Sequence, residues 1–141
     1  MLKHSHQIRV TYQETDKMGI VYYANYLRWF EIGRTEYMRQ AGITYKELEE
    51  EGIFLPVLES HCEYHQPARY DDLIRIETTI NKLKRVRIGF SYKILESESD
   101  ELLAVGNTIH SFVNQDFEPI SPQREKPELW KLLKKNFDKK K

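Results

Sequence analysis

The chain has 141 residues, 22 basic against 22 acidic side chains and 40% apolar residues, which predicts one domain with one hydrophobic core and excludes an intrinsically disordered chain. A formal net charge of zero removes the basic footprint that nucleic-acid binding requires, so no nucleic-acid partner is expected. With a single cysteine, no apolar leader in residues 1–10 and no uncharged run near the roughly 20 residues of a membrane span, the composition indicates a cytoplasmic protein.

The N-terminal part of the chain predicts one strand followed by two helices. Residues 7–12 alternate between apolar and polar side chains, as in a half-buried strand. Apolar residues recur every three or four positions over residues 23–41, which predicts a long amphipathic helix that Gly42 ends. Gly33 lies on the apolar stripe of that helix, where a missing side chain allows close packing against a sheet. A capping-box spacing predicts a short second helix over residues 44–51.

The remainder of the chain is predicted to form strands and one last helix. Pro56 places the mixed segment 53–66 at a sheet edge or bulge. Three segments, residues 73–83, 86–95 and 102–114, alternate clearly, and the last has a face of small residues on which a helix could lie close. Pro127 suits the first position of a terminal helix that ends near residue 137, followed by a disordered lysine tail at 138–141.

The order of these elements predicts a single α+β domain over residues 1–141. Late strands joined by short turns pair in an antiparallel way. About five strands would then form one sheet, and the apolar stripe of the 23–41 helix would cover one of its faces.

The most informative stretch, residues 12–26, places an acidic side chain directly before the start of the long helix. Asp16 lies in a predicted turn, and Gly19 allows the backbone a tight approach. The first helical amides, around residues 22–25, have N–H groups without partners inside the helix and favour negative charge. A carboxylate that faces such amides suits acyl transfer, because the amides stabilise an oxyanion while the carboxylate attacks the carbonyl or activates water. The alternative is that Asp16 only caps the turn.

This stretch resembles the signature of the bacterial acyl-CoA thioesterases of the hotdog fold, in which an aspartate precedes the central helix. The likeness covers most of residues 7–115 and extends to the YbgC-type and 4-hydroxybenzoyl-CoA thioesterases. Residues 67–73 are also similar to the family's entry into its third strand. The matching residues are Tyr12, Glu14, Thr15, Asp16, Gly19, Val21, Tyr22, Ala24, Asn25 and Tyr26, followed by Phe30, Glu31, Arg34, Thr35 and Glu36.

The resemblance implies a hotdog fold, in which the sheet wraps around the long helix, and hydrolysis of a coenzyme A thioester without a metal or an organic cofactor. Asp16 would be the nucleophile or the general base, and the backbone amide of Tyr23, alone or with that of a neighbour, would bind the oxyanion. Many YbgC-type members carry histidine where this chain has Tyr23, so no imidazole can act at that position. The resemblance also implies a homodimer or homotetramer with the acyl pocket against a partner subunit. Motif residues expected in the substrate site are Tyr12, Gly19, Val21 and Asn25.

Coenzyme A carries phosphates, and two groups of cations could bind them. Lys84, Arg85 and Arg87 lie close together in the predicted turn between two strands. Arg69 is a second candidate. The alternative for both is a solvated charge without a ligand.

The histidines and the cysteine have structural explanations. His61 and His65 lie on a predicted strand, where four residues span roughly 13 Å, too far to share a zinc ion. Cys62 has no visible activating neighbour and is expected to pack. His110 is expected inside the fold or at an interface.

Charged helix faces leave two further alternatives open. Glu31, Arg34 and Glu36 on the long helix either form a salt-bridged face or supply the acid of another thioesterase branch. The terminal helix has leucines on one side and lysines elsewhere, so it either docks on its own sheet or contacts an anionic membrane surface.

The residues and the resemblance together predict an acyl-CoA thioesterase. Two other functions fit the same features. One is a non-catalytic hotdog module that binds acyl-CoA or a protein. The other is a thioesterase that acts on acyl carrier protein, for which the basic run 82–87 would be a docking surface.

Overall fold

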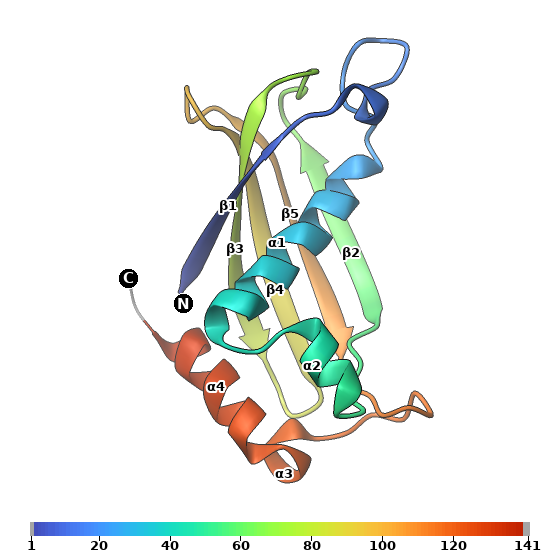
Figure 1. Cartoon of the computed structure of the whole chain (residues 1–141), viewed down its shortest axis with the longest axis vertical. Helices are drawn as coiled ribbons and strands as arrows, with labels where there is room; N and C mark the ends of the chain where they lie inside the picture. The colour runs from blue at the N-terminus through green and yellow to red at the C-terminus, as the bar shows by residue number, and fades with distance from the viewer. Residues whose placement is uncertain (1, 140–141) are drawn as a thin grey trace.

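A five-stranded antiparallel sheet curls around one long helix, α1 (Figure 1). The computed structural model describes residues 2–139. The strands are β1 (Lys3–Arg9), β2 (Val57–Tyr64), β3 (Leu73–Leu83), β4 (Arg87–Glu96) and β5 (Leu102–Ser111); the helices are α1 (Asn25–Ala41), α2 (Tyr45–Glu50), α3 (Pro122–Glu125) and α4 (Pro127–Asp138), with a 3-10 helix η1 at Tyr12–Glu14.

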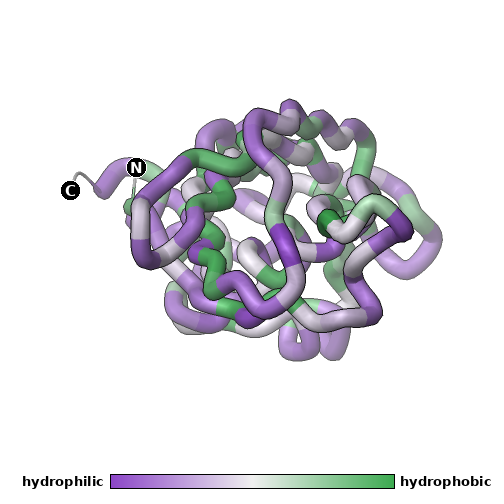
Figure 2. The backbone as a smooth tube through the Cα atoms, turned by 90° about the horizontal axis from the view of Figure 1, so that it is seen from above, coloured by the Kyte–Doolittle hydropathy of each residue, from purple (hydrophilic) through white to green (hydrophobic). Residues whose placement is uncertain are grey.

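The strand order β1-β3-β4-β5-β2 confirms the predicted α+β class and the hotdog arrangement. β1 and β2 are the two edges, and β2 carries the irregular register between Val57 and Glu59 that Pro56 led us to expect. Seen from above, hydrophobic residues are interspersed with hydrophilic ones along the chain (Figure 2). In β3, every second residue from Ile74 to Ile80 is buried. This alternation buries one face of the sheet against the helix.

The predicted strand 7–12 is wrong at both ends, because β1 starts at Lys3 and stops at Arg9. His4 and His6 are half-buried on the same face of β1 as Ile8. At the other end, Thr11 and Glu14 form a capping box that turns the chain into η1 and leaves the Tyr12 ring 77% exposed. The expected disordered tail is also wrong at its start, since α4 includes Asp138. Lys140 and Lys141 lie outside the described residues.

Two glycines let α1 approach the sheet closely. A Cβ atom on Gly33 would lie 2.5 Å from Thr78 Oγ1 and 2.7 Å from Ile76 Cγ2. A Cβ atom on Gly106 of β5 would lie 2.5 Å from the ring of Phe30. The close packing predicted at these small residues is therefore confirmed.

The C-terminal helix α4 closes the end of the barrel-like sheet that lies away from the start of α1 (Figure 1). Its Leu129 and Leu133 are buried in the core, and the Asn136 carbonyl accepts a hydrogen bond from the Leu2 amide. Of the two alternatives for this helix, docking on its own sheet is correct, and its leucine side is not available to a membrane surface. Over residues 2–139, no helix combines the length and apolar character of a membrane span.

We expect Gly33→Ala to lower the free energy of unfolding by about 1–3 kcal/mol, because the added methyl group would force Thr78 and Ile76 to move. In an open helix the same change would stabilise the protein by about 1 kcal/mol, so chemical denaturation distinguishes the two cases by sign. Adding Thr78→Ala removes the nearest clashing atom and should recover part of the loss. Unchanged or higher stability of Gly33→Ala alone would contradict the close approach.

Candidate active site

The Asp16 carboxylate lies in a tight turn that its own atoms help to hold. Its Oδ1 accepts a hydrogen bond from the Met18 amide at 2.8 Å, and its carbonyl accepts one from Gly19 at 3.0 Å. Gly19 has φ +80°, a conformation that glycine adopts without strain. Oδ1 of Asp16 therefore caps the turn, as the alternative interpretation of this residue predicted. Oδ2 has no protein donor among residues 2–139. The turn orients the carboxylate and leaves one oxygen available for chemistry.

Backbone pairing fixes this turn to the sheet and to the start of α1. Ile20 forms a bridge with Arg69, and the Val21 amide donates to the Ala68 carbonyl at 2.8 Å. The Tyr22 amide donates to the Glu14 carbonyl at 2.9 Å. The chain therefore enters the helix in one defined direction.

Two backbone N–H groups at this entry have no acceptor within residues 2–139, those of Tyr23 and Ala24. Ala24 already has helical backbone angles, φ −66° and ψ −22°, so its N–H points out of the N-terminal end of α1. Unpaired amides in this position stabilise an anion, with support from the helix dipole. The amide of Tyr23 that the sequence singled out is free, and that of Ala24 joins it.

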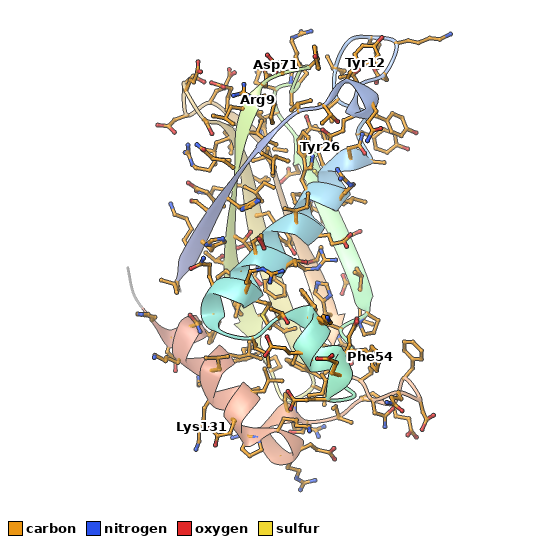
Figure 3. All side chains as sticks on the ribbon, in the orientation of Figure 1. Arg9, Tyr12, Tyr26, Phe54, Asp71 and Lys131 are labelled. Carbon is orange, nitrogen blue, oxygen red and sulfur yellow. The ribbon has the colours of Figure 1, made fainter. Side chains whose placement is uncertain are left out.

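A cavity of about 360 Å³ lies between this helix start and the end of β2. Its walls include Asp16, Val21, Tyr23, Tyr26 and Tyr64. The Tyr64 ring stands edge-on to Tyr26, with centroids 5.0 Å apart, and to Tyr23 at 6.5 Å. Figure 3 labels Tyr26 at this end of α1. The cavity thus brings together a carboxylate, a residue with a free amide and aromatic surface.

A second hollow of about 400 Å³ lies on the outer face of the sheet. It is lined by polar side chains such as Ser91 and Asn107, and by Glu77, which pairs with Lys3 at 3.3 Å. No helix start adjoins it, because α1 lies on the other face. Although this hollow is slightly larger, the chemistry indicates the cavity beside Asp16.

Comparisons with known proteins identify the family to which the chain belongs. The family model of the thioesterase-like superfamily matches residues 10–129. The chain belongs to this superfamily. It is 36% identical to the acyl-CoA thioesterase YbgC of Haemophilus influenzae over 66% of this chain and 69% of that protein, and 33% identical to YneP of Bacillus subtilis over 86% and 88%. Among solved structures, the DHNA-CoA thioesterase of Staphylococcus aureus superposes with a TM-score of 0.91 at 32% identity, covering 96% of this chain and 91% of that one.

Glu14, two residues before Asp16, has a structural role that sequence reasoning missed. Its side chain is 6% exposed and accepts hydrogen bonds from the Thr11 amide and hydroxyl, from Trp29 Nε1 at 2.9 Å and from Arg28 at 3.0 Å. Burial by itself raises the pKa of the Glu14 carboxyl, but the bonds from Thr11 and Trp29 and the charge of Arg28 lower it below its ordinary value. The Thr-x-x-Glu spacing was the available signal. Its meaning depended on Trp29, which only the fold brings close.

The structure divides the motif residues into those on the cavity and those that support it. Val21 lines the cavity, whereas the Asn25 side chain donates to the Glu14 carbonyl at 2.9 Å and therefore holds the loop. Tyr12 lies outside the cavity, where its ring meets Tyr70 edge-on at 5.7 Å.

His65 lines the same cavity as Asp16, a proximity that the sequence did not indicate. Reasoning from the strand pattern considered His65 only as a metal ligand. Within residues 2–139, no group of acidic, histidine or cysteine side chains could hold a metal ion. The His65 imidazole thus lies on the cavity wall, whereas position 23 has a tyrosine in place of a histidine.

The two groups of candidate phosphate ligands lie in different places. Arg69 is exposed beside the Asp16 turn, through its bridge to Ile20. Lys84, Arg85 and Arg87 are exposed at the turn after β3, and β3 runs eleven residues, roughly 35 Å, away from the Asp16 end (Figure 1). Within one chain, the basic turn and the cavity do not meet.

The remaining candidates have structural roles. His110 is buried, and burial lowers its pKa to about 4 although a hydrogen bond to the Leu55 carbonyl opposes this. Burial raises the pKa of the Cys62 thiol, as expected for a packing residue. On α1, Glu36 pairs with Arg39 at 3.0 Å, which favours the salt-bridged interpretation of that helix face.

We expect Glu14→Gln to lower the free energy of unfolding by about 1–3 kcal/mol at pH 7, because an amide loses the charge and part of the acceptor capacity that the four donors use. The folded pKa of Glu14 lies below 4.5, so this contribution is complete above pH 4.5 and is lost as the pH falls through the folded pKa. Urea denaturation should therefore show a difference between variant and wild type that shrinks in acid.

Glu47→Gln is the matched control, because Glu47 forms a similar capping box with Thr44 but is exposed. A loss for Glu14→Gln no larger than that for Glu47→Gln would contradict the anchoring role.

Proposed function

We propose that this protein hydrolyses an acyl-CoA thioester to a free carboxylic acid and coenzyme A, with Asp16 as nucleophile or general base. One observation carries the proposal: Asp16, with a carboxylate oxygen that has no protein donor, and Tyr23, with an unpaired amide, line one cavity, and the unpaired amide of Ala24 follows directly in the chain. This is the donor and acceptor set that acyl transfer needs. Family membership supports the same reaction.

The chemistry requires no other group on the protein to move a proton to sulfur. A thiol of ordinary pKa near ~8.5 leaves as a thiolate with little protonation. Asp16 either attacks the carbonyl carbon, forming an anhydride that water then opens, or removes a proton from the water that attacks. In both routes the carbonyl oxygen becomes negative, and the amides of Tyr23 and Ala24 stabilise it.

An aromatic acyl group fits this cavity best. The rings of Tyr23, Tyr26 and Tyr64 meet edge-on along its wall, an arrangement that accepts a further ring by stacking or edge contact. The similarity to the DHNA-CoA thioesterase of Staphylococcus aureus favours the same class. A hydrolysis screen over short, long and aromatic acyl-CoAs tests this, and a higher kcat/KM for long alkyl chains would contradict it.

A homodimer through β2 is the proposed minimal unit. β2 is an edge strand of eight residues, nearly all exposed, with Val57, Leu58 and Tyr64 among its exposed apolar residues and neither lysine nor proline within it. Such an edge normally pairs. The other edge, β1, carries Lys3 and Arg9. Antiparallel pairing of β2 with its copy would extend the sheet and set Val57 of one chain opposite Tyr64 of the other, beside the cavity.

This pairing would also move the basic turn toward the active site. A two-fold axis at the middle of β2 inverts the partner, so its Lys84, Arg85 and Arg87 would lie at the Asp16 end of the first chain. The turn would stand about three strand spacings, roughly 15 Å, from the shared edge. We propose that these cations bind coenzyme A phosphates across the dimer, with Arg69 on the same chain as Asp16.

We expect Asp16→Asn to reduce kcat/KM for acyl-CoA by more than a hundredfold, about 2.7 kcal/mol, while the fold and oligomeric state stay unchanged. Asparagine keeps the shape and the turn hydrogen bond but removes the charge. Steady-state hydrolysis with circular dichroism and sedimentation measures both parts. Retention of more than about a tenth of the activity would show that the carboxylate is not catalytic.

The wild-type protein also tests the two alternative functions. Binding of acyl-CoA without turnover would identify a non-catalytic module, and turnover only of thioesters on acyl carrier protein would identify that protein as the carrier.

Mixed dimers test whether the basic turn acts across the interface. Replacing Lys84, Arg85 and Arg87 by glutamine should raise KM for acyl-CoA with little change in kcat, because the phosphates are bound equally in ground and transition states. A mixed dimer pairs one chain of this triple variant with one chain that carries Asp16→Asn. Its single active site has Asp16 from the first chain and the intact cations from the second, so it should regain the wild-type KM. Failure to regain it, or equal losses on an acyl thioester without the nucleotide, would exclude the clamp.

A further inference from the structure

Tyr64 reaches the helix start from a distant strand. It lies at the end of β2, and its hydroxyl donates a hydrogen bond to the Tyr23 carbonyl at 3.1 Å, across 41 positions of sequence. The same carbonyl also accepts the Tyr26 amide, at the longer distance of 3.3 Å. The Tyr64 ring rests edge-on against Tyr23 and Tyr26. Both the ring and the hydroxyl of Tyr64 are therefore directed at the first turn of α1.

The Tyr23 carbonyl belongs to the peptide group that carries the unpaired Ala24 N–H. The two bonds of one peptide are coplanar and point in opposite directions. A donor that fixes the carbonyl therefore also fixes the direction of the N–H. Hydrogen bonding at the oxygen further polarises the peptide and makes its N–H a stronger donor.

We propose that Tyr64 is a positioning residue of the thioesterase, which orients and polarises the Ala24 amide as an oxyanion donor through the Tyr23 carbonyl. The inference rests on the proposed function and adds a residue to it. Tyr64 acts through the peptide that it holds, so its hydroxyl matters when negative charge develops on the substrate oxygen and not when the substrate is merely bound.

The environment of the Tyr64 hydroxyl suits a permanent donor. Burial, together with the neighbouring Cys62, raises the pKa of Tyr64, so the phenol keeps its proton at neutral pH. The Cys62 thiol and the hydroxyl are neighbours on the inward face of β2. Both sit beside the β2 edge that the dimer would cover.

Tyr64→Phe is the test, because it keeps the ring that lines the cavity and deletes only the hydroxyl. We expect kcat to fall about threefold to tenfold, the range for losing one neutral hydrogen bond, with KM and the melting temperature unchanged. Removing a direct oxyanion donor lowers kcat by roughly 10²–10³-fold, so the loss expected for Tyr64→Phe is smaller. Tyr70→Phe is the matched control: Tyr70 is an exposed tyrosine of the neighbouring loop with no hydroxyl bond in the described chain, and its variant should behave as wild type.

Two coenzyme A analogues separate positioning from a general structural role. A methylene ketone, in which a CH₂ group separates carbonyl and sulfur, resembles the bound substrate and should bind both proteins equally. A trifluoromethyl ketone that hydrates to a tetrahedral adduct should bind Tyr64→Phe more weakly by the same factor as the fall in kcat. Equal weakening of both analogues, a lowered melting temperature with parallel losses in KM and kcat, or wild-type kcat would each overturn the proposal. Loss of the proposed function would instead appear as no turnover by the wild-type protein.

Discussion

The buried carboxylate of Glu14 is the interaction on which the candidate site depends. It gathers donors from Thr11 before η1 and from Trp29 inside α1, so two segments separated by the whole Asp16 loop share one anion. The loop between them has no apolar side chain buried deeply enough to hold it, apart from Val21. This anion adds a side-chain anchor to the backbone pairing that ties the Asp16 turn to the sheet and to the start of α1. A charge with several donors is well suited to this task, because a shift of either segment would leave a buried ion unpaired.

Close contact between α1 and the sheet sets where the helix begins. Gly33 and Gly106 remove side chains at the two points where the backbone and Phe30 come nearest. With the helix seated this deeply, its N-terminal end lies level with the end of β2, and Tyr64 can reach the Tyr23 carbonyl. Packing in the middle of the molecule thus determines hydrogen bonding at its end.

The site of a single chain is open on the side of β2. Aromatic rings line the inner wall of the cavity, whereas the strand beside it presents an unpaired edge with exposed apolar residues. The basic turn lies at the wrong end of the same chain for any ligand of Asp16. The proposed two-fold pairing of β2 would account for both features, because it would cover the edge and exchange the ends of the sheet.

Much of this protein can be predicted from local pattern, because the signals are carried by residues near one another in sequence. Helical spacing over residues 23–41 identified α1, alternation identified β3 to β5, and the position of Asp16 just before the helix predicted a carboxylate close to the first helical amides. Asp16 and Tyr23 do line one cavity, because a turn and the helix that follows it must be neighbours in space. The predicted end of β1 was wrong because the capping box of Thr11 and Glu14 overrides the alternation through Tyr12, and the Glu14 carboxylate is held by Trp29 from another element.

Contacts between distant segments depend on the order and register of the strands, which only the tertiary structure decided. Tyr64 and His65 lie on the Asp16 cavity because β2 pairs with β5 at the edge beside α1. The Lys84–Arg87 turn lies far from it because β3 is long and leads away. Side-chain type and short spacing determine which residues can act and where the chain turns. The burial of one face of the sheet against α1 determines which of these residues come into contact. That burial depends on the order and register of all the strands, so it cannot be predicted from any one segment.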